Sequence, residues 1–349
     1  MTGLFATAVL GVELAYWQET LIKIVVGLLA ILLPAGTLVY LFLFKMMSFM
    51  QSRLGPMEAG PFGSLQLLAE VGKFLQKEDI FPARADRYVF GLAPVVVLIS
   101  TFVMVLVLPG GPDATFLDLN TGIYFALAVS SISVIGILMA GWASASKYAL
   151  LGGLRAAGQL IAYELPLVLA VVGVVIQAET LNMNEIVFQQ ANWEIFGWGG
   201  IGMPFIFTQF IGFAIFLIAI QAELTQPPFD MPVAESELVT GYLTEYSGLR
   251  FLLFFIAEFA TAGVFSAIGA VLFLGGWYVP GIDPDSNLFN IIGPLVLAGK
   301  MILIAFLIFW FRVTYPRFRE DQLQRLAWKV LIPLALANIV VTAVLKVVW

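Results

Sequence analysis

The sequence contains neither cysteine nor histidine among its 349 residues. A chain without thiols forms no disulfide and ligates no iron–sulfur cluster through thiolates, and a chain without imidazoles lacks the common ligands of haem and zinc. These absences exclude an ordinary redox metal centre, and we expect no cofactor to be bound by this chain alone. Any electrons that it helps to transfer must arrive from a partner protein.

Charged residues are also scarce, at 11% of the chain, whereas hydrophobic residues make up 61% and the mean hydropathy is +0.98. Soluble globular proteins do not have this composition, but integral membrane proteins do, so the lipid bilayer is the expected environment. The 32 glycines suit membrane helices, because small residues let neighbouring helices approach closely. The first twenty residues carry no Lys or Arg, which argues against a cleavable signal peptide.

Apolar segments recur along the chain, and eight of them have the length of about 20 residues that crosses a bilayer. No internal repeat is visible, so we predict a single integral membrane domain over residues 1–349. The expected fold class is an all-α polytopic membrane protein, a bundle of about eight transmembrane helices with an interfacial amphipathic helix and structured cytoplasmic loops. The predicted spans are residues 21–44, 88–109, 122–142, 160–178, 202–222, 251–275, 291–312 and 329–348.

Lysine and arginine cluster in the loops after the odd-numbered spans, which hold fourteen of the 17 basic residues. Because cytoplasmic loops carry an excess of Lys and Arg, we predict that these odd loops are cytoplasmic in a bacterial inner (plasma) membrane and that both termini lie outside. The basic residues concerned are Lys45, Arg53, Lys73, Lys77, Arg84 and Arg87, then Lys147 and Arg155, then Arg250, and finally Arg312, Arg317, Arg319, Arg325 and Lys329.

The first odd loop contains the segment SLQLLAEVGKFLQKED, whose pattern predicts a helix that is too short and too charged to span a bilayer. It is expected to lie along the membrane surface, either as a plain anchor or as the wall of a functional site. Its polar positions are Gln66, Glu70, Lys73 and Lys77, and its apolar positions are Leu65, Leu68, Val71 and Leu75.

The third odd-loop region leads into the fourth span with Lys147, Arg155 and then Glu164. Glu164 is predicted to lie about one turn inside that span, where a charge is costly and points to function. The alternative is a structural Glu at a helix N-terminus, where the helix dipole stabilises the carboxylate.

The most unusual stretch runs from Glu223 to Glu258 and holds six acidic residues with a single base, Arg250. Like charges so close together raise one another's pKa, so we interpret the stretch as a proton-handling element at a membrane boundary. Glu258 lies within FFIAEF, and leaving it ionised in lipid would be expensive, so it must face protein or water or be protonated. The other acids are Asp230, Glu235, Glu237 and Glu245; a merely solvated acidic loop is the alternative for those at the surface.

Two further features of the odd loops yield expectations. Three prolines within TQPPFDMP predict a rigid, extended segment that presents Phe229 and Asp230, and ESELVTGYLTEYS predicts a short helix on which Glu237 and Glu245 share a face. The basic loop RVTYPRFREDQLQRLAWK sets topology, or binds anionic lipid or a soluble partner.

Three segments together resemble one family. They are SRLGPMEAGPFGSLQLLAEVGKFLQKE, GWASASKYALLGGLRAAGQLIAYE, and AELTQPPFDMPVAESELVTGYLTEYSG followed by FFIAEF. They resemble, in sequence and order, the H-type membrane subunit of respiratory complex I, the proton-pumping NADH:quinone oxidoreductase, which is equivalent to mitochondrial subunit 1. The resemblance covers nearly the whole chain.

The resemblance implies a heel subunit that joins the membrane arm to the soluble arm and forms the tunnel through which quinone (ubiquinone in many members) enters. Quinone is then the substrate, while iron–sulfur clusters and FMN belong to partner subunits. Implied partners are other membrane-arm subunits and the soluble quinone-reducing subunits, and no nucleic acid is expected. Position by position, the resemblance assigns proton transfer and coupling to Glu164, Glu223, Glu258, Asp230, Glu235 and Glu237, and the tunnel or its seam with the soluble arm to Arg53, Lys73, Phe229 and Arg155.

The chain departs from the family pattern at several positions. Leu43 and Phe44 stand where a Glu-Arg pair is frequent, Ala145 where Asn is usual, Thr225-Gln226 where Asn-Arg is frequent, and Val233 where Glu is frequent. Several of these flank the implied quinone tunnel, so quinone type and electron donor, NADH or a ferredoxin-type protein, stay open, as does the pumped ion, H⁺ or Na⁺.

Other functions fit parts of the pattern. Intramembrane acids also suit a stand-alone proton-coupled transporter. Related subunits anchor energy-converting hydrogenases, and a purely structural anchor for a soluble oxidoreductase is a further alternative. A transporter would work alone in liposomes, whereas a complex subunit would purify with iron–sulfur partners.

Overall fold

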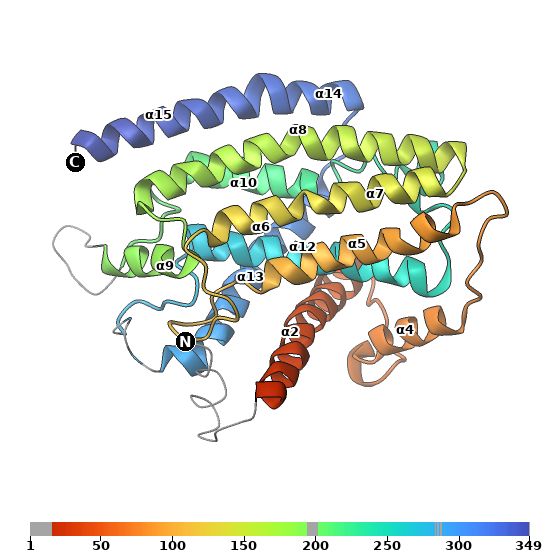
Figure 1. Cartoon of the computed structure of the whole chain (residues 1–349), viewed down its shortest axis with the longest axis horizontal. Helices are drawn as coiled ribbons and strands as arrows, with labels where there is room; N and C mark the ends of the chain where they lie inside the picture. Colours follow the sequence, from red (N-terminus) through yellow and green to blue (C-terminus); the bar gives the residue numbers. More distant parts are fainter. Residues whose placement is uncertain (1–15, 194–201, 283, 285, 287, 349) are drawn as a thin grey trace.

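A computed structural model describes residues 16–193, 202–282, 284, 286 and 288–348, and every regular element within these residues is a helix (Figure 1). The expectation of an all-α polytopic membrane protein is thereby confirmed. Seven helical stretches in the described chain are long and apolar enough to cross a membrane. Helices α5, α7, α8 and α15 run side by side along the long axis of the molecule in Figure 1, and they pack against one another in the order α5–α7–α8–α15.

The long helices follow the predicted spans closely in most cases. The first is continuous through α2 (Tyr16–Leu38), the π-helical turn η1 (Val39–Met46) and α3 (Met47–Met50). The last is continuous through α14 (Glu320–Leu326), η4 (Ala327–Leu331) and α15 (Ile332–Val348). Between them lie α5 (Arg87–Val105), α6 (Gly122–Ser130) with α7 (Ile132–Ala143), α8 (Lys147–Ala178), α12 (Gly248–Phe273) and α13 (Phe289–Thr314).

Helix α8 differs most from its prediction, because it begins at Lys147 rather than near residue 160. Lys147 and Arg155 are therefore helical residues and not loop residues. Glu164 stands in the middle of this 32-residue helix, about 25 Å along the axis from its first residue. The alternative that Glu164 is a dipole-stabilised residue at a helix N-terminus is wrong for this structure.

The fifth predicted span is shorter than expected. Helix α10 covers only Phe210–Glu223, and the described residues before it form turns from Phe205 to Thr208. Its 14 residues are about 21 Å long, less than the hydrocarbon core of about 30 Å. The apolar run of the sequence therefore overstates the helix, because part of it folds as turns that pack on α12.

The loops separate onto two ends of the bundle. At the first end, which we call the odd-loop end, the segments 51–86, 224–247 and 315–319 meet. Arg250 pairs with Asp79 at 2.6 Å, the Ser247 hydroxyl donates to the Glu78 carbonyl at 3.1 Å, and the Phe318 amide donates to a carbonyl of the 224–247 segment at 3.0 Å. Segments far apart in sequence thus form one surface.

The opposite end, the even-loop end, consists of segments 106–121, 179–193 and 274–282. It contains the unpredicted helix α9 (Met183–Asn192). Asn184 donates to the Pro112 carbonyl at 2.8 Å and accepts from the Trp277 indole at 2.9 Å, so one side chain joins the three segments. The alternation of basic and acidic loops in the sequence therefore corresponds to two separate ends of the folded molecule.

The segment 224–247 lies directly against α8. Gly152 in α8 leaves room for it, because a Cβ there would come within 2.6 Å of the Tyr242 nitrogen. Gly241 has φ +56°, and a Cβ on it would lie 1.7 Å from the Pro232 carbonyl oxygen. Both positions require glycine: Gly152 lets the segment pack closely on α8, and Gly241 lets the segment fold back on its own Pro232.

The helix predicted from ESELVTGYLTEYS does not form as one unit. The structure has a single turn α11 (Glu235–Leu238) and a 3₁₀ turn η3 (Gly241–Leu243), separated by Val239 at φ +66°. Glu237 and Glu245 therefore do not share a helical face. The tight packing on α8 takes precedence over the local helical pattern.

The predicted surface helix is present as α4 (Gln66–Gln76), at one side of the bundle in Figure 1. None of its residues is buried. Leu68 and Leu75 of the helix, and Leu65 directly before it, are exposed. An amphipathic helix with an uncovered apolar face suits a membrane surface or a partner chain.

Candidate functional site

The candidate site is built around the segment between α10 and α12, at the odd-loop end. Gln159 of α8, which is 2% exposed, donates through its amide nitrogen to the carbonyls of Ala222 and Phe229, at 2.7 Å each. Gln221 donates to the Pro227 carbonyl at 2.6 Å. These two neutral side chains fix the backbone at both sides of the proline-rich turn.

Phe229, a predicted tunnel residue, is 3% exposed. Its ring lies between those of Tyr163 and Phe318, with centroid distances of 5.2 and 5.4 Å. Aromatic contacts of this kind add to the stability that burial provides. Within this chain Phe229 therefore packs the segment onto α8 and onto the stretch of chain that follows α13.

Glu258 is half-buried on α12 and makes a hydrogen bond to an uncharged residue. The amide nitrogen of Gln226 donates to Glu258 Oε1, and the amide oxygen of Gln226 accepts from the Arg312 guanidinium at the end of α13. Gln226 is 2% exposed. A carboxylate, an amide and a guanidinium thus form one continuous hydrogen-bonded chain, in which the central amide is buried and the two charged groups are partly buried.

Asp230 lies beside this chain, outside the membrane-spanning helices. Burial raises the pKa of its carboxyl to about 6; the nearby Arg317 and Arg312 act in the opposite direction, while Glu258 and Glu235 add to the increase. A carboxyl group with a pKa near the operating pH exchanges protons readily. Asp230 is therefore suited to taking up and releasing a proton.

Glu223 and Glu164 form a second pair of acids that repel each other electrostatically, with Ser131 as a hydrogen-bonding neighbour of Glu164. Three buried acceptor oxygens around the end of α10 find no donor among the described residues: Gln159 Oε1, Gln221 Oε1 and Glu223 Oε2. Buried polar atoms without partners are costly, so this place favours an added proton or another donor.

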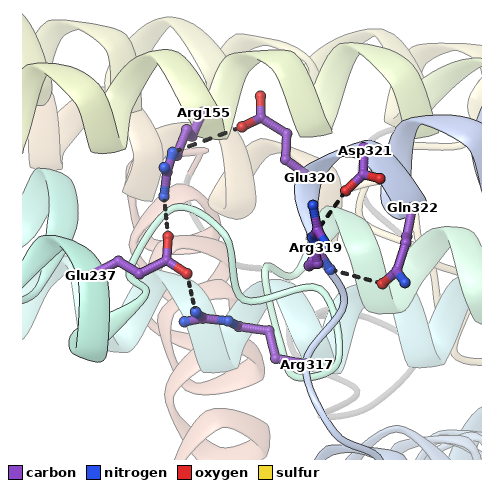
Figure 2. Close-up of polar contacts among 7 residues, drawn as sticks. All are labelled: Arg155, Glu237, Arg317, Arg319, Glu320, Asp321 and Gln322. Atoms are coloured by element: carbon purple, nitrogen blue, oxygen red, sulfur yellow. Dashed lines mark hydrogen bonds and ion pairs between the residues drawn. The ribbon is translucent and has the colours of Figure 1, made fainter.

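Glu237 lies outside the bundle between two arginines (Figure 2). One oxygen is 2.8 Å from Arg155 of α8, and the other accepts from Arg317 in the segment after α13. The hydrogen bond from Arg155 and the charge of Arg317 lower the pKa of Glu237. The carboxylate therefore stays ionised and ties together three segments of the odd-loop end.

Arg155 also lines a polar pocket of about 580 Å³. Arg155 also lies 3.9 Å from Glu320, and Arg319 pairs with Asp321 at 3.3 Å (Figure 2). The pocket is lined by Arg155, Met231, Glu237, Arg319, Glu320, Asp321 and Gln324. It is a charged, open surface at the odd-loop end.

The remaining predicted residues make no hydrogen bond or ion pair with the buried acids in the described part of the chain, although Glu235 acts electrostatically on Asp230. Glu235 is exposed at the start of α11. Arg53 is exposed and donates to Gln51 at 2.8 Å, and Lys73 on α4 pairs with Glu70. The structure brings these two bases into no contact with the buried acids among the described residues.

The positions that depart from the family pattern have local explanations in part. Leu43 and Phe44 lie in η1 and pack against the main core, and Val233 packs against a second core cluster. Ala145 has φ +50°, a conformation that Asn adopts more readily than Ala. Ala145 therefore carries backbone strain that an Asn would reduce.

Sequence reasoning found the acids but missed the neutral residues that connect them. Gln226 stood out only as a departure, and Arg312 and Arg317 only as topology-setting charges. Nothing in the sequence pointed to a role for Gln159. A base in the last turn of a predicted span, such as Arg312, is the one pattern that could have suggested a partner for a buried acid.

The structure places partly or fully buried carboxyl groups among the membrane helices of this all-helical protein. No group of His, Cys, Asp or Glu side chains in the described part of the chain could hold a metal ion. These features define the class of protein: a polytopic helical membrane protein with carboxyl groups placed inside its helix bundle.

Comparison with known proteins identifies the family. Residues 22–343 match the family model described as NADH dehydrogenase. The chain is 48% identical over 303 residues to the H subunits of the NADH-quinone oxidoreductases of Bacillus thuringiensis (strain Al Hakam), Bacillus cereus (strain AH187) and Bacillus anthracis (strain CDC 684 / NRRL 3495), with 86% of each chain covered. The chain belongs to this family of H-type membrane subunits of NADH-quinone oxidoreductase, complex I, and the resemblance noted from the sequence is confirmed.

Proposed function

We propose that this membrane subunit of complex I couples quinone reduction in the soluble arm to proton movement in the membrane arm, and that it provides the channel for the quinone. The observation that carries the coupling role is the partly buried chain Glu258–Gln226–Arg312, which interacts electrostatically with Asp230. In this arrangement a change of charge at the odd-loop end acts on a carboxyl group inside the bundle.

The coupling works through charge and through the rigid segment. The Asp230 carboxyl interacts electrostatically with Arg317 and Arg312 and with the Glu258 carboxyl. Reduction of quinone by a partner subunit changes the charge near Asp230. The altered protonation of Asp230 then changes the protonation of Glu258. Through the 224–247 segment, it also changes the protonation of Glu223 and Glu164.

The channel role is supported by an apolar pocket of about 370 Å³ between α2, α5 and α12. It is lined by Leu28, Leu32, Leu98, Ile99, Phe102, Leu253 and Ile256. A wholly apolar lining suits an isoprenoid chain, and Ile256 lies only two residues before Glu258 on α12. The proposed quinone path therefore runs along α12, the helix that also carries Glu258. Arg53, Lys73 and Phe229 stay predictions for its outer part.

The odd-loop end is the proposed cytoplasmic face, because it gathers most of the Lys and Arg residues. Its charged pocket beside Arg155 and Glu237 and the uncovered apolar face of α4 are the proposed contacts with soluble and membrane-arm partners. Iron–sulfur clusters and FMN are proposed to belong to those partners.

The test is Glu258→Gln in the intact complex. The variant keeps a hydrogen-bonding side chain but no longer exchanges a proton, so assembly should persist while proton translocation per NADH oxidised falls severalfold. Glu179→Gln is the control, since Glu179 is an exposed acid paired with Lys346 at the even-loop end. If the two variants pump equally well, the bundle is an anchor only and the proposed function is wrong.

A further inference from the structure

The oxygen and nitrogen of the Gln226 amide have a fixed orientation, and the reason is chemical. A guanidinium can only donate hydrogen bonds, so the atom of Gln226 that faces Arg312 must be the oxygen. The amide NH₂ group is then directed at Glu258 Oε1. Because the side chain is 2% exposed, it has little freedom to turn away from both partners.

This orientation has a consequence for the protonation of Glu258. Oε1 accepts a hydrogen bond from Gln226, and a hydroxyl oxygen is a weaker acceptor than a carbonyl or carboxylate oxygen, so the carboxyl proton is favoured on Oε2. An acceptor that bears a charge makes the stronger hydrogen bond, and consecutive aligned dipoles reinforce one another. The chain from Arg312 through the amide is aligned in the sense that stabilises a carboxylate.

We propose that Gln226 is a positioning residue: oriented by Arg312, it stabilises the ionised form of Glu258 and favours Oε2 as the site of that residue's exchangeable proton. Arg312 thus acts on Glu258 through a neutral amide and without direct contact. The inference rests on the proposed function for its biological meaning, but the protonation of Glu258 itself can be measured without turnover.

Other charged and titratable groups also act on Glu258. Asp230 and Tyr242, both from the 224–247 segment, interact electrostatically with it, as does Arg312 from α13. The experiment therefore leaves Asp230 and Tyr242 unchanged and is performed at one neutral pH.

The test is infrared spectroscopy of the resting complex, which distinguishes a carboxylate from a protonated carboxyl group. Subtracting the Glu258→Gln spectrum from that of the parent isolates the bands of Glu258 and gives its ionised fraction. Arg312→Gln frees the amide to turn, and Gln226→Leu breaks the chain while keeping Arg312. Each should produce a protonated-carboxyl band that disappears when Glu258→Gln is added.

The matched control is Gln209→Leu, which removes another glutamine of 2% exposure at the even-loop end, where it bonds Asn338 and Thr342. It should leave the Glu258 signal unchanged. If Arg312→Gln produces the band and Gln226→Leu does not, Arg312 acts through space and the proposal is overturned. No band in either variant also overturns it.

A compensating variant keeps the test decisive if Gln226→Leu fails to assemble. Gln226→Arg places a permanent positive donor beside Glu258, so Arg312→Gln should no longer produce the band in that background. A band that persists there would refute action through residue 226. Failure of the proposed function is separate, because it would appear as normal pumping in Glu258→Gln whatever the infrared result.

Discussion

The two ends of the bundle are held together by different chemistry. At the odd-loop end the long-range contacts include ion pairs, as in Arg250–Asp79 and the Glu237 carboxylate between Arg155 and Arg317. At the even-loop end they are made mainly by neutral amides. There Gln190 donates to the Val271 carbonyl at 2.8 Å and accepts from the Phe205 amide at 3.1 Å.

The two ends differ in whether their polar side chains can change charge. Amides do not titrate, so a buried network of Gln and Asn has one hydrogen-bonding pattern at every physiological pH. Carboxylates and guanidinium groups respond to nearby charge, so the odd-loop end can change when a proton or an electron arrives close to it. One end of the molecule is therefore fixed, and the other is responsive.

The largest expected effect tests the fixed end. Gln190→Leu leaves the Val271 carbonyl and the Phe205 amide without partners in a site where Gln190 is 1% exposed. Two unsatisfied buried groups should lower the free energy of unfolding by about 2–4 kcal/mol. Thermal unfolding of the purified complex measures this, and the loss should be the same at pH 5 and pH 8. A pH-dependent loss, or none, would contradict a purely structural role; the exposed Gln51→Leu is the control.

A second effect tests the responsive end through Asp230. Its pKa is about 6 in the folded chain against an ordinary value of 3.8, so between these values the folded state binds more protons than the unfolded state. The contribution of Asp230 to the free energy of unfolding is therefore fully present below pH 3.8 and declines as the pH rises toward 6. Asp230→Asn mimics the neutral form and should remove this decline.

The measurement is the unfolding midpoint of parent and Asp230→Asn across that pH window. The two should converge at the acidic limit and separate as pH rises, with the variant the more stable. Glu179→Gln, which alters an exposed acid at the other end, should follow the parent curve. Parallel curves for Asp230→Asn and the parent would show that Asp230 is not the responsive group.

The smallest effect concerns backbone strain at the odd-loop end. Ala145 has φ +50°, so Ala145→Gly or Ala145→Asn should stabilise the chain by about 0.5–1 kcal/mol. The gain should appear in the unfolding midpoint without any change in proton translocation. An unchanged midpoint would mean that the parent accommodates the strain elsewhere.

Much of the fold could be predicted because apolar length and loop charge are local signals. Helix α8 was misjudged at its start because Lys147, Arg155 and two adjacent glycines have the composition of a loop. Those glycines instead allow close packing: Gly152 against Gly241 and Gly153 against Gly141. Such contacts depend on residues distant in sequence, which no local pattern contains.

The site was predictable only in its charged members. A carboxyl group in an apolar run is conspicuous, and Glu258 was found in that way. Gln226 and Arg312 are 86 positions apart, and an amide carries neither charge nor strong hydropathy, so nothing in the sequence joined them. The acids could be identified one by one, but the connections between them required the fold.

The length of α8 has a consequence for the lipid around the protein. Its 32 residues extend about 48 Å, whereas the hydrocarbon layer is about 30 Å thick. If the helix is perpendicular to the membrane plane, several of its turns project from the hydrocarbon layer, and Arg155, near the start of the helix, lies in the projecting part. In a thicker bilayer the guanidinium would be drawn toward the acyl chains and away from water, so membrane thickness should influence how firmly Arg155 holds Glu237.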